Sequence, residues 1–215
     1  MKYCVSCVMP NTKPGVVFNN HGICGACLHK KTKENIDWDE RKKRLLKICD
    51  KIKKTNEGPY DCLIPVSGGK DSFYQTYIMK EVCGLRPLVI VVPPHVQTIE
   101  GIDNLNNLVN VLNVDLQKIS VKPSVYIKFR LIGMRDLGNP NYAEHAVVFA
   151  GVTRAALNYK IPLIVWGEDI GLEFGGNVDD QSLLEGNAIN INNNDLFNNV
   201  KLENLLKDEI SENEL

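Results

Sequence analysis

Residues 60–74, YDCLIPVSGGKDSFY, decide the fold that we expect for this chain. Residues 61–66 are a short apolar run of β-strand length, and from Phe73 onward apolar residues recur at helical spacing. Between the two lie residues 67–72, SGGKDS. The stretch therefore predicts a strand, a glycine turn and a helix in immediate succession.

A turn of this kind suits a phosphate group. The N-terminus of a helix presents unpaired backbone N–H groups and the positive end of the helix dipole. Gly68 and Gly69 let the backbone come close to phosphate oxygens, and Lys70 adds a positive charge. The hydroxyl groups of Ser67 and Ser72 can donate further hydrogen bonds.

Asp71 distinguishes a bare phosphate site from a magnesium–nucleotide site. A carboxylate repels phosphate unless a divalent cation lies between them, so we interpret the turn as a Mg²⁺–nucleotide site. The alternative is a plain strand-to-helix turn that Asp71 or Ser72 caps. The spacing differs from that of a Walker loop, G-x-x-x-x-G-K-[ST], and from that of G-x-G-x-x-G.

Size and composition set further bounds. With 215 residues, of which 44% are hydrophobic, the chain can bury one core and a small satellite module. The formal net charge of −1 creates no global field that would recruit nucleic acid. The sequence lacks an apolar run of transmembrane length and a signal-peptide pattern, so we expect a cytoplasmic protein.

Two C-x-x-C pairs predict a structural metal site within residues 1–29. Cys4 pairs with Cys7, and Cys24 with Cys27, which is the spacing of a tetrahedral Cys4 zinc ribbon. Four thiolates leave zinc no open coordination position, so this metal would serve folding. A redox-active C-x-x-C pair and an iron–sulfur cluster are the alternatives.

Residues 30–57 are rich in charge and carry one apolar helical stripe that includes Trp38, Leu45 and Cys49. Lysines and arginines surround the stripe. We interpret this segment as a linker helix with a solvated outer face. The alternative is a basic face that docks an acidic partner or a nucleic acid.

Strand-like and helical segments alternate after the glycine turn. Residues 88–92 and 116–121 are of strand type, and residues 99–112 have helical periodicity. This order predicts an α/β fold with a doubly wound parallel sheet. The carboxyl ends of its strands, which include residues 66–67, 92–93 and 121–122, should meet at one ligand-binding crevice.

A fourth strand is expected over residues 163–166, after an irregular to helical stretch at 123–141 and a helix at 142–159. Glu168 and Asp169 follow this strand at the edge of the same crevice. They are candidates for holding the metal or orienting a substrate amine, and a helix cap or a solvated loop explains them equally well.

The composition changes near residue 186. Asparagine occupies seven of the 13 positions at 187–199, and residues 201–215 are acidic. We therefore expect four segments: a zinc ribbon (1–29), a linker helix (30–57), a nucleotide-binding domain (58–185) and a tail (186–215) that is loosely ordered or docks on a partner.

The SGGKDS turn resembles the pyrophosphate loop of the ATP pyrophosphatase (PP-loop) superfamily. The resemblance implies a Rossmann-like domain in which a substrate oxygen attacks the α phosphorus of ATP and pyrophosphate leaves. The implied ATP-binding residues are Ser67, Gly68, Gly69, Lys70, Asp71 and Ser72. Lys70 and Asp71 would also act in catalysis, with Asp71 on Mg²⁺.

Two subfamilies combine such a loop with an N-terminal cysteine ribbon. The tRNA 2-thiolation enzymes carry additional cysteines in mid-chain, whereas here none follows Cys83, and sulfur relay needs a thiol or a cluster. The chain is more similar to the N-acetyl sugar amidotransferase family of lipopolysaccharide and flagellin-sugar biosynthesis. The similarity covers about residues 1–180 and rests on C-V-S-C-V-M-P-N-T, P-G-V-V-F, G-I-C-G-A-C, residues 60–72, Gly138-Asn-Pro, His145 and Trp166-Gly-Glu.

That resemblance implies that ATP adenylates the N-acetyl oxygen of a nucleotide sugar and that ammonia then displaces AMP. A glutaminase partner with a cyclase-like subunit would supply the ammonia. Glu168 would guide ammonia or hold substrate, while Lys122 and Arg154 either reach the crevice or are surface charges. Members of the family are longer, so we expect part of the sugar site to be missing; a nucleotide-binding scaffold is the non-enzymatic alternative.

Overall fold

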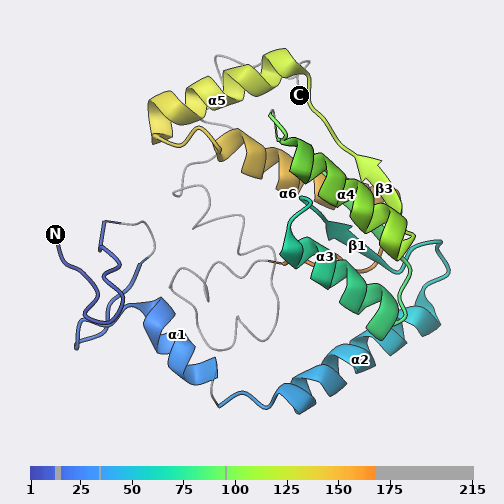
Figure 1. Ribbon diagram of the computed structural model, residues 1–215, viewed down its shortest axis with the longest axis horizontal. Helices are drawn as coiled ribbons and strands as arrows, with labels where there is room; N and C mark the ends of the chain where they lie inside the picture. Colours follow the sequence, from blue (N-terminus) through green and yellow to red (C-terminus); the bar gives the residue numbers. More distant parts are fainter. Residues whose placement is uncertain (13–15, 34, 95, 168–215) are drawn as a thin grey trace. The chain divides into compact units, whose positions relative to one another are not determined.

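The computed structural model describes residues 1–12, 16–33, 35–94 and 96–167 of the chain (Figure 1). They belong to two compact units, Met1–Trp38 and Asp39–Gly167. The predictions for Glu168, Asp169 and the asparagine-rich tail lie outside the described residues. The four predicted segment boundaries remain predictions.

The N-terminal unit brings its two C-x-x-C knuckles together through the backbone. The N–H of Cys4 donates to the carbonyl of Met9 at 2.8 Å, and the N–H of Val5 donates to the carbonyl of Gly22 at 3.1 Å. Helix α1, Gly25–Lys33, begins directly after Cys24. Gly22 has a φ of +74°, a left-handed conformation that glycine adopts without strain.

The second unit contains a parallel sheet of β1 (Cys62–Pro65), β2 (Pro87–Val91) and β3 (Asp115–Lys118), in the order β1-β2-β3. The fourth segment is shorter than the strand predicted at 163–166. It forms one parallel bridge, Leu63↔Ile164, at the free edge of β1. Because β2 lies on one side of β1 and this segment on the other, the strand order reverses there and creates the switch point at which α/β sheets bind ligands.

The helices follow the predicted alternation: α2 (Trp38–Thr55), α3 (Lys70–Tyr77), α4 (Ile99–Leu112), α5 (Pro123–Leu137) and α6 (Tyr142–Asn158), with a π-helical turn η1 (Ile78–Val82) continuing α3. Residues 123–141, expected to be only partly regular, are mostly α5. A proline at its start and a left-handed Gly138 at its C-cap delimit that helix. None of the helices in the described part of the chain combines the length and apolar character needed to cross a bilayer.

Two predicted boundaries were displaced. The first helix begins at Lys70 rather than Phe73 because Gly69 already serves as its N-cap. The third strand was expected over residues 116–121 but ends at Lys118, although the N–H of Ile119 still donates to the carbonyl of Val91 at 2.9 Å. Its side chains are mostly exposed, as is usual for an edge strand.

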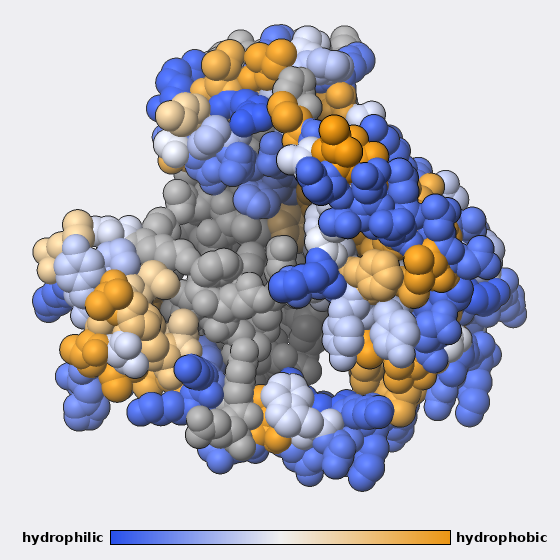
Figure 2. Space-filling view, in the orientation of Figure 1, coloured by the Kyte–Doolittle hydropathy of each residue, from blue (hydrophilic) through white to orange (hydrophobic). Residues whose placement is uncertain are grey.

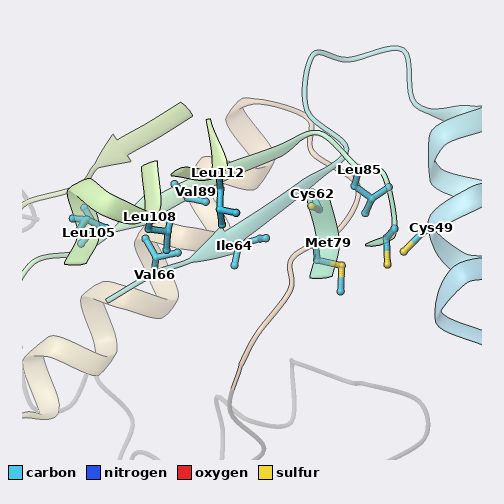
Figure 3. Packing of buried hydrophobic residues seen from close by; sticks show 12 residues of the cluster. Cys49, Cys62, Ile64, Val66, Met79, Leu85, Val89, Leu105, Leu108 and Leu112 are labelled. Carbon is cyan, nitrogen blue, oxygen red and sulfur yellow. The ribbon is translucent and has the colours of Figure 1, made fainter. Parts of the chain in front are cut away.

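Helices cover both faces of the sheet, which confirms the doubly wound α/β fold. On one face Ile64 and Val89 pack against Leu105, Leu108 and Leu112 of α4 (Figure 3). On the other face, Leu63 of β1 and Leu88 and Ile90 of β2 pack against α6, whose buried residues in this cluster are Val152, Ala155 and Ala156. The visible outer face of α4 is largely hydrophilic, as expected for a helix that buries only one side (Figure 2).

Asp61 fastens the start of β1 to the start of β2. Its carboxylate is 1% exposed and accepts hydrogen bonds from the backbone N–H and guanidinium of Arg86 at 2.8–2.9 Å and from the Asn56 amide at 2.8 Å. The Arg86 side chain is the main cause that lowers the pKa of Asp61 to about 2, against the opposing effect of burial. The carboxylate is therefore favoured in the folded state.

We expect Asp61→Asn to remove pH-dependent stability. A pKa lowered from 3.8 to about 2 stabilises the folded state by about 2 kcal/mol above pH 4, and this contribution disappears as the pH falls from about 4 to about 2. Urea unfolding at pH 7 and pH 3 should show a smaller difference for the variant than for the parent. Asp103→Asn, at an exposed position of α4, should keep the parental difference; equal pH profiles for Asp61→Asn and the parent would contradict the prediction.

Candidate functional site

The glycine turn leaves the sheet at the switch point. The N–H of Val66 still pairs with the carbonyl of Ile90 at 2.8 Å, and the chain then turns through Ser67, Gly68 and Gly69 into α3. The predicted succession of strand, glycine turn and helix is therefore present. It places the N-terminus of α3 at the carboxyl edge of the sheet.

Gly68 is fixed by a close backbone contact. Its φ is +82°, and a Cβ at this position would lie 2.7 Å from the carbonyl oxygen of Gly101 in the first turn of α4. The N–H of Gly101 donates to the Thr98 hydroxyl at 3.1 Å, which caps α4. The N-terminal turns of two helices thus meet at the glycine turn, and both contribute positive potential there.

The N-terminus of α3 has no side-chain cap among the described residues. The Ser72 hydroxyl donates to the carbonyl of Gly69 at 3.0 Å, and the N–H of Gly69 donates to Ser67 Oγ at 3.3 Å. Neither Asp71 nor Ser72 therefore caps α3 as the alternative of a plain turn supposed. The first N–H groups of α3 remain available to an anion.

Lys70 and Asp71 stand in the first turn of α3 with exposed side chains. Their charged groups pair with each other at 2.7 Å, while the side chains are 87% and 78% exposed. An exposed pair of this kind is separated at little cost, so both groups can turn to a ligand. A lysine for phosphate and a carboxylate for a divalent cation are the pair that the turn was predicted to supply.

The other predicted residues are more widely distributed. Lys122 is the N-cap residue of α5, and Arg154 is exposed in α6, as is His145. Nothing in the described residues brings Arg154 to the glycine turn. Glu168, the third predicted catalytic residue, follows the last described residue, Gly167.

Gln75 is a site residue that the sequence interpretation missed. Its Nε2 donates to the carbonyl of Val165 at 3.2 Å, and a Cβ at Gly167 would lie 3.1 Å from its Oε1. The only signal in the sequence is its position four residues after Asp71, which places both side chains on one face of α3.

The second site is a cluster of Cys4, Cys7, Cys24 and Cys27 in the N-terminal unit. The four sulfur atoms all lie within 4.8 Å of one another, with Cys7 Sγ 3.5 Å from Cys24 Sγ and Cys4 Sγ 4.0 Å from Cys27 Sγ. A tetrahedral zinc ion with bonds of about 2.3 Å separates its sulfur ligands by about 3.8 Å. The donor set therefore fits a tetrahedral metal, and the cluster could hold one.

Backbone amides surround the Cys4 sulfur. The N–H groups of Cys24 and Ser6 approach it at 3.2 and 3.4 Å. Burial raises the pKa of Cys4, but the amides of Cys24, Ser6 and Cys7 outweigh it and lower the pKa to about 6. For Cys7, the Met9 amide lowers the pKa, but the neighbouring thiols of Cys27 and Cys24 outweigh this effect and raise it to about 12.

Comparison with known proteins gives few relatives by sequence. No family model matches the chain. An uncharacterized protein from Methanocaldococcus jannaschii is 32% identical over 114 residues, which are 53% of this chain and 40% of the archaeal protein. The chain thus spans less than half the length of this relative.

Similar solved structures include NMN synthetase from Francisella tularensis (TM-score 0.46, 18% identity, 63% of this chain and 56% of that one). The NH3-dependent NAD synthetase from Campylobacter jejuni has a TM-score of 0.46 and 14% identity over 71% of this chain and 61% of its own. The U34-tRNA thiolase NcsA from Methanococcus maripaludis, with its [4Fe-4S] cluster, has a TM-score of 0.42 and 14% identity over 89% and 61%. The chain spans less than two thirds of each of these proteins.

Proposed function

We propose that this chain binds Mg²⁺–ATP at the glycine turn and adenylates an amide oxygen of its substrate. The observation that carries the proposal is the N-terminus of α3, which has no side-chain cap among the described residues and carries the exposed Lys70 and Asp71. A Cβ at Gly68 would collide with the Gly101 carbonyl, so the turn closely approaches α4, whose N-terminal turn adds its own positive potential. These features suit a group that carries several negative charges.

The residues of the turn would stabilise the leaving pyrophosphate. With ATP bound at the turn, the N–H groups at the start of α3 and the Lys70 ammonium would stabilise the negative charge that develops on pyrophosphate as its bond to the α phosphorus breaks. Asp71 would hold Mg²⁺, which neutralises phosphate charge when bound. An amide carbonyl is a poor electrophile, and transfer of adenylate to its oxygen converts that oxygen into a leaving group.

We further propose an N-acetylated nucleotide sugar as the substrate, on the similarity of the cysteine motifs and the SGGKDS turn to sugar amidotransferases. Ammonia would add to the amide carbon whose oxygen carries the adenylate, the bond between that carbon and the oxygen would break to release AMP, and the product would be an amidine in a surface-polysaccharide sugar. A glutaminase with a cyclase-like subunit would supply the ammonia, and Glu168 would guide it. The four ribbon cysteines would hold zinc in a structural role.

Pyrophosphate release tests the proposal. The parent should release pyrophosphate from Mg²⁺–ATP in the presence of an N-acetylated UDP-sugar and ammonium chloride. Lys70→Ala should lower kcat by about 100-fold because the leaving pyrophosphate loses the positive charge that stabilises it. Lys43→Ala, on the exposed part of α2, is the matched control and should retain the parental rate.

Two outcomes would replace the proposal. Normal ATP binding without pyrophosphate release, in the presence of the glutaminase partner, would indicate a nucleotide-binding scaffold. Incorporation of sulfur into tRNA, measured as thiouridine by mass spectrometry, would indicate a thiolation enzyme.

A further inference from the structure

The hydrogen-bond ladder between β1 and the fourth segment stops at Pro65. The N–H of Leu63 donates to the carbonyl of Leu163 at 2.8 Å, and the N–H of Val165 donates to the carbonyl of Leu63 at 2.9 Å. In a parallel ladder, the next bond would run from the N–H of residue 65 to the carbonyl of Val165. Proline has no N–H, so this carbonyl loses its partner within the sheet.

The side chain of Gln75 supplies the missing donor. Its Nε2 reaches the carbonyl of Val165 at 3.2 Å from α3, the helix that the glycine turn begins. The same side chain lies against Gly167, where an added Cβ would approach its Oε1 to 3.1 Å. One amide group therefore joins the loop helix to the end of the fourth segment across the switch point.

We propose that Gln75 is a positioning residue that sets the separation between the glycine turn and the chain leaving the sheet at Gly167. Pro65 ends the ladder, which leaves the switch point open beyond Val165, and the Gln75 amide holds the open edge at a fixed spacing. The two sides of the nucleotide crevice, α3 and the fourth segment, are then held together by a side-chain hydrogen bond instead of a backbone one. The role of the crevice in binding nucleotide rests on the function proposed above; the structural role of Gln75 does not.

Hydrogen exchange tests the structural role in the full chain. Gln75→Leu removes the donor and leaves the Val165 carbonyl unpaired, so the fourth segment should separate from β1 more often. The Val165 N–H, which donates to the Leu63 carbonyl, should then exchange with solvent about ten times faster. Gln75→Glu keeps the shape, but an ionised carboxylate cannot donate, so it should accelerate exchange at least as much. Tyr77→Phe, at an exposed position of the same helix, should exchange like the parent.

Restoring the backbone donor gives the decisive variant. In Pro65→Val combined with Gln75→Leu, the valine N–H can take the Val165 carbonyl, so slow exchange should return. If the double variant exchanges as fast as Gln75→Leu, or if Gln75→Leu exchanges like the parent, the inference is wrong. The rescue also separates a lost hydrogen bond from general misfolding, because a merely misfolded Gln75→Leu would not recover.

Nucleotide binding tests the functional role. In a Trp38→Phe background, the emission of Trp166, which lies between Val165 and Gly167, should change when Mg²⁺–ATP binds. Gln75→Leu should lose this change and weaken binding by about tenfold in equilibrium dialysis. Full binding and a full emission change in Gln75→Leu would overturn the inference. A parent that binds no ATP would instead overturn the proposed function, and the exchange experiment would still decide the role of Gln75.

Discussion

Replacing Gly68 by alanine is expected to destabilise the second unit by about 3 kcal/mol and to abolish nucleotide binding. A left-handed backbone costs an alanine about 1 kcal/mol, and the collision of its Cβ with a backbone oxygen adds strain that no side-chain movement relieves. The new Cβ would lie 2.7 Å from the Gly101 carbonyl, so the turn and the first turn of α4 must separate. Urea unfolding and equilibrium dialysis with Mg²⁺–ATP measure the two effects.

Gly138→Ala separates the cost of the left-handed backbone from the cost of the steric collision. Gly138 at the C-cap of α5 also has a left-handed φ, +63°, but an added Cβ there has no neighbour within 4 Å in the described structure. Its replacement should cost only about 1 kcal/mol, the conformational part of the effect. Equal losses in the two variants would show that the contact with α4 is unimportant.

Replacing Cys24 by serine is expected to remove the metal from the N-terminal unit. Cys24 is fully buried, and its sulfur lies 3.5 Å from that of Cys7, so the variant loses a ligand from the interior of the cluster. We expect one zinc per chain in a colourless parent and an affinity at least about 100-fold lower in the variant, because binding of a structural metal is coupled to folding of its site. Elemental analysis and competition with a chelator measure this change.

Cys49→Ser is the matched control for the metal. Cys49 is equally buried but packs in the core of the second unit beside Met79 and Leu85 (Figure 3). Its replacement should lower stability without changing the metal content. Iron, with absorption in the visible range, would replace the zinc interpretation by an iron–sulfur cluster, and full metal content in Cys24→Ser would show that the four cysteines are not the ligands.

Local patterns predicted the features that depend on local physics. The periodicity of residues 99–112 gave the bounds of α4, and the apolar run at 88–92 gave β2 within one residue. The glycine turn was placed correctly because glycine, lysine and serine at this spacing constrain the backbone over only six residues. The Cys4 cluster was found because C-x-x-C spacing brings two thiols together in each knuckle.

Features that depend on contacts between residues far apart in the chain were harder to predict from the sequence. The fourth segment reads as a strand, but pairing with β1 stops after one bridge because Pro65 offers no N–H. Gln75 takes the place of the N–H that Pro65 lacks, and no sequence pattern in α3 predicts this role. The boundary of the third strand also depended on the sheet, since its exposed residues gain little from burial at the edge.

The sequence alone determined the alternation of strands and helices, the glycine turn and the two C-x-x-C pairs, since each follows from the chemistry of residues near one another in the chain. Only the tertiary structure decided that Gly68 lies against Gly101 of α4 and that Gln75 completes the ladder at Val165. Both contacts join residues more than 30 positions apart. Their energy depends on distances of a few ångströms that are fixed by packing on the two faces of the sheet, and residue order does not specify such distances.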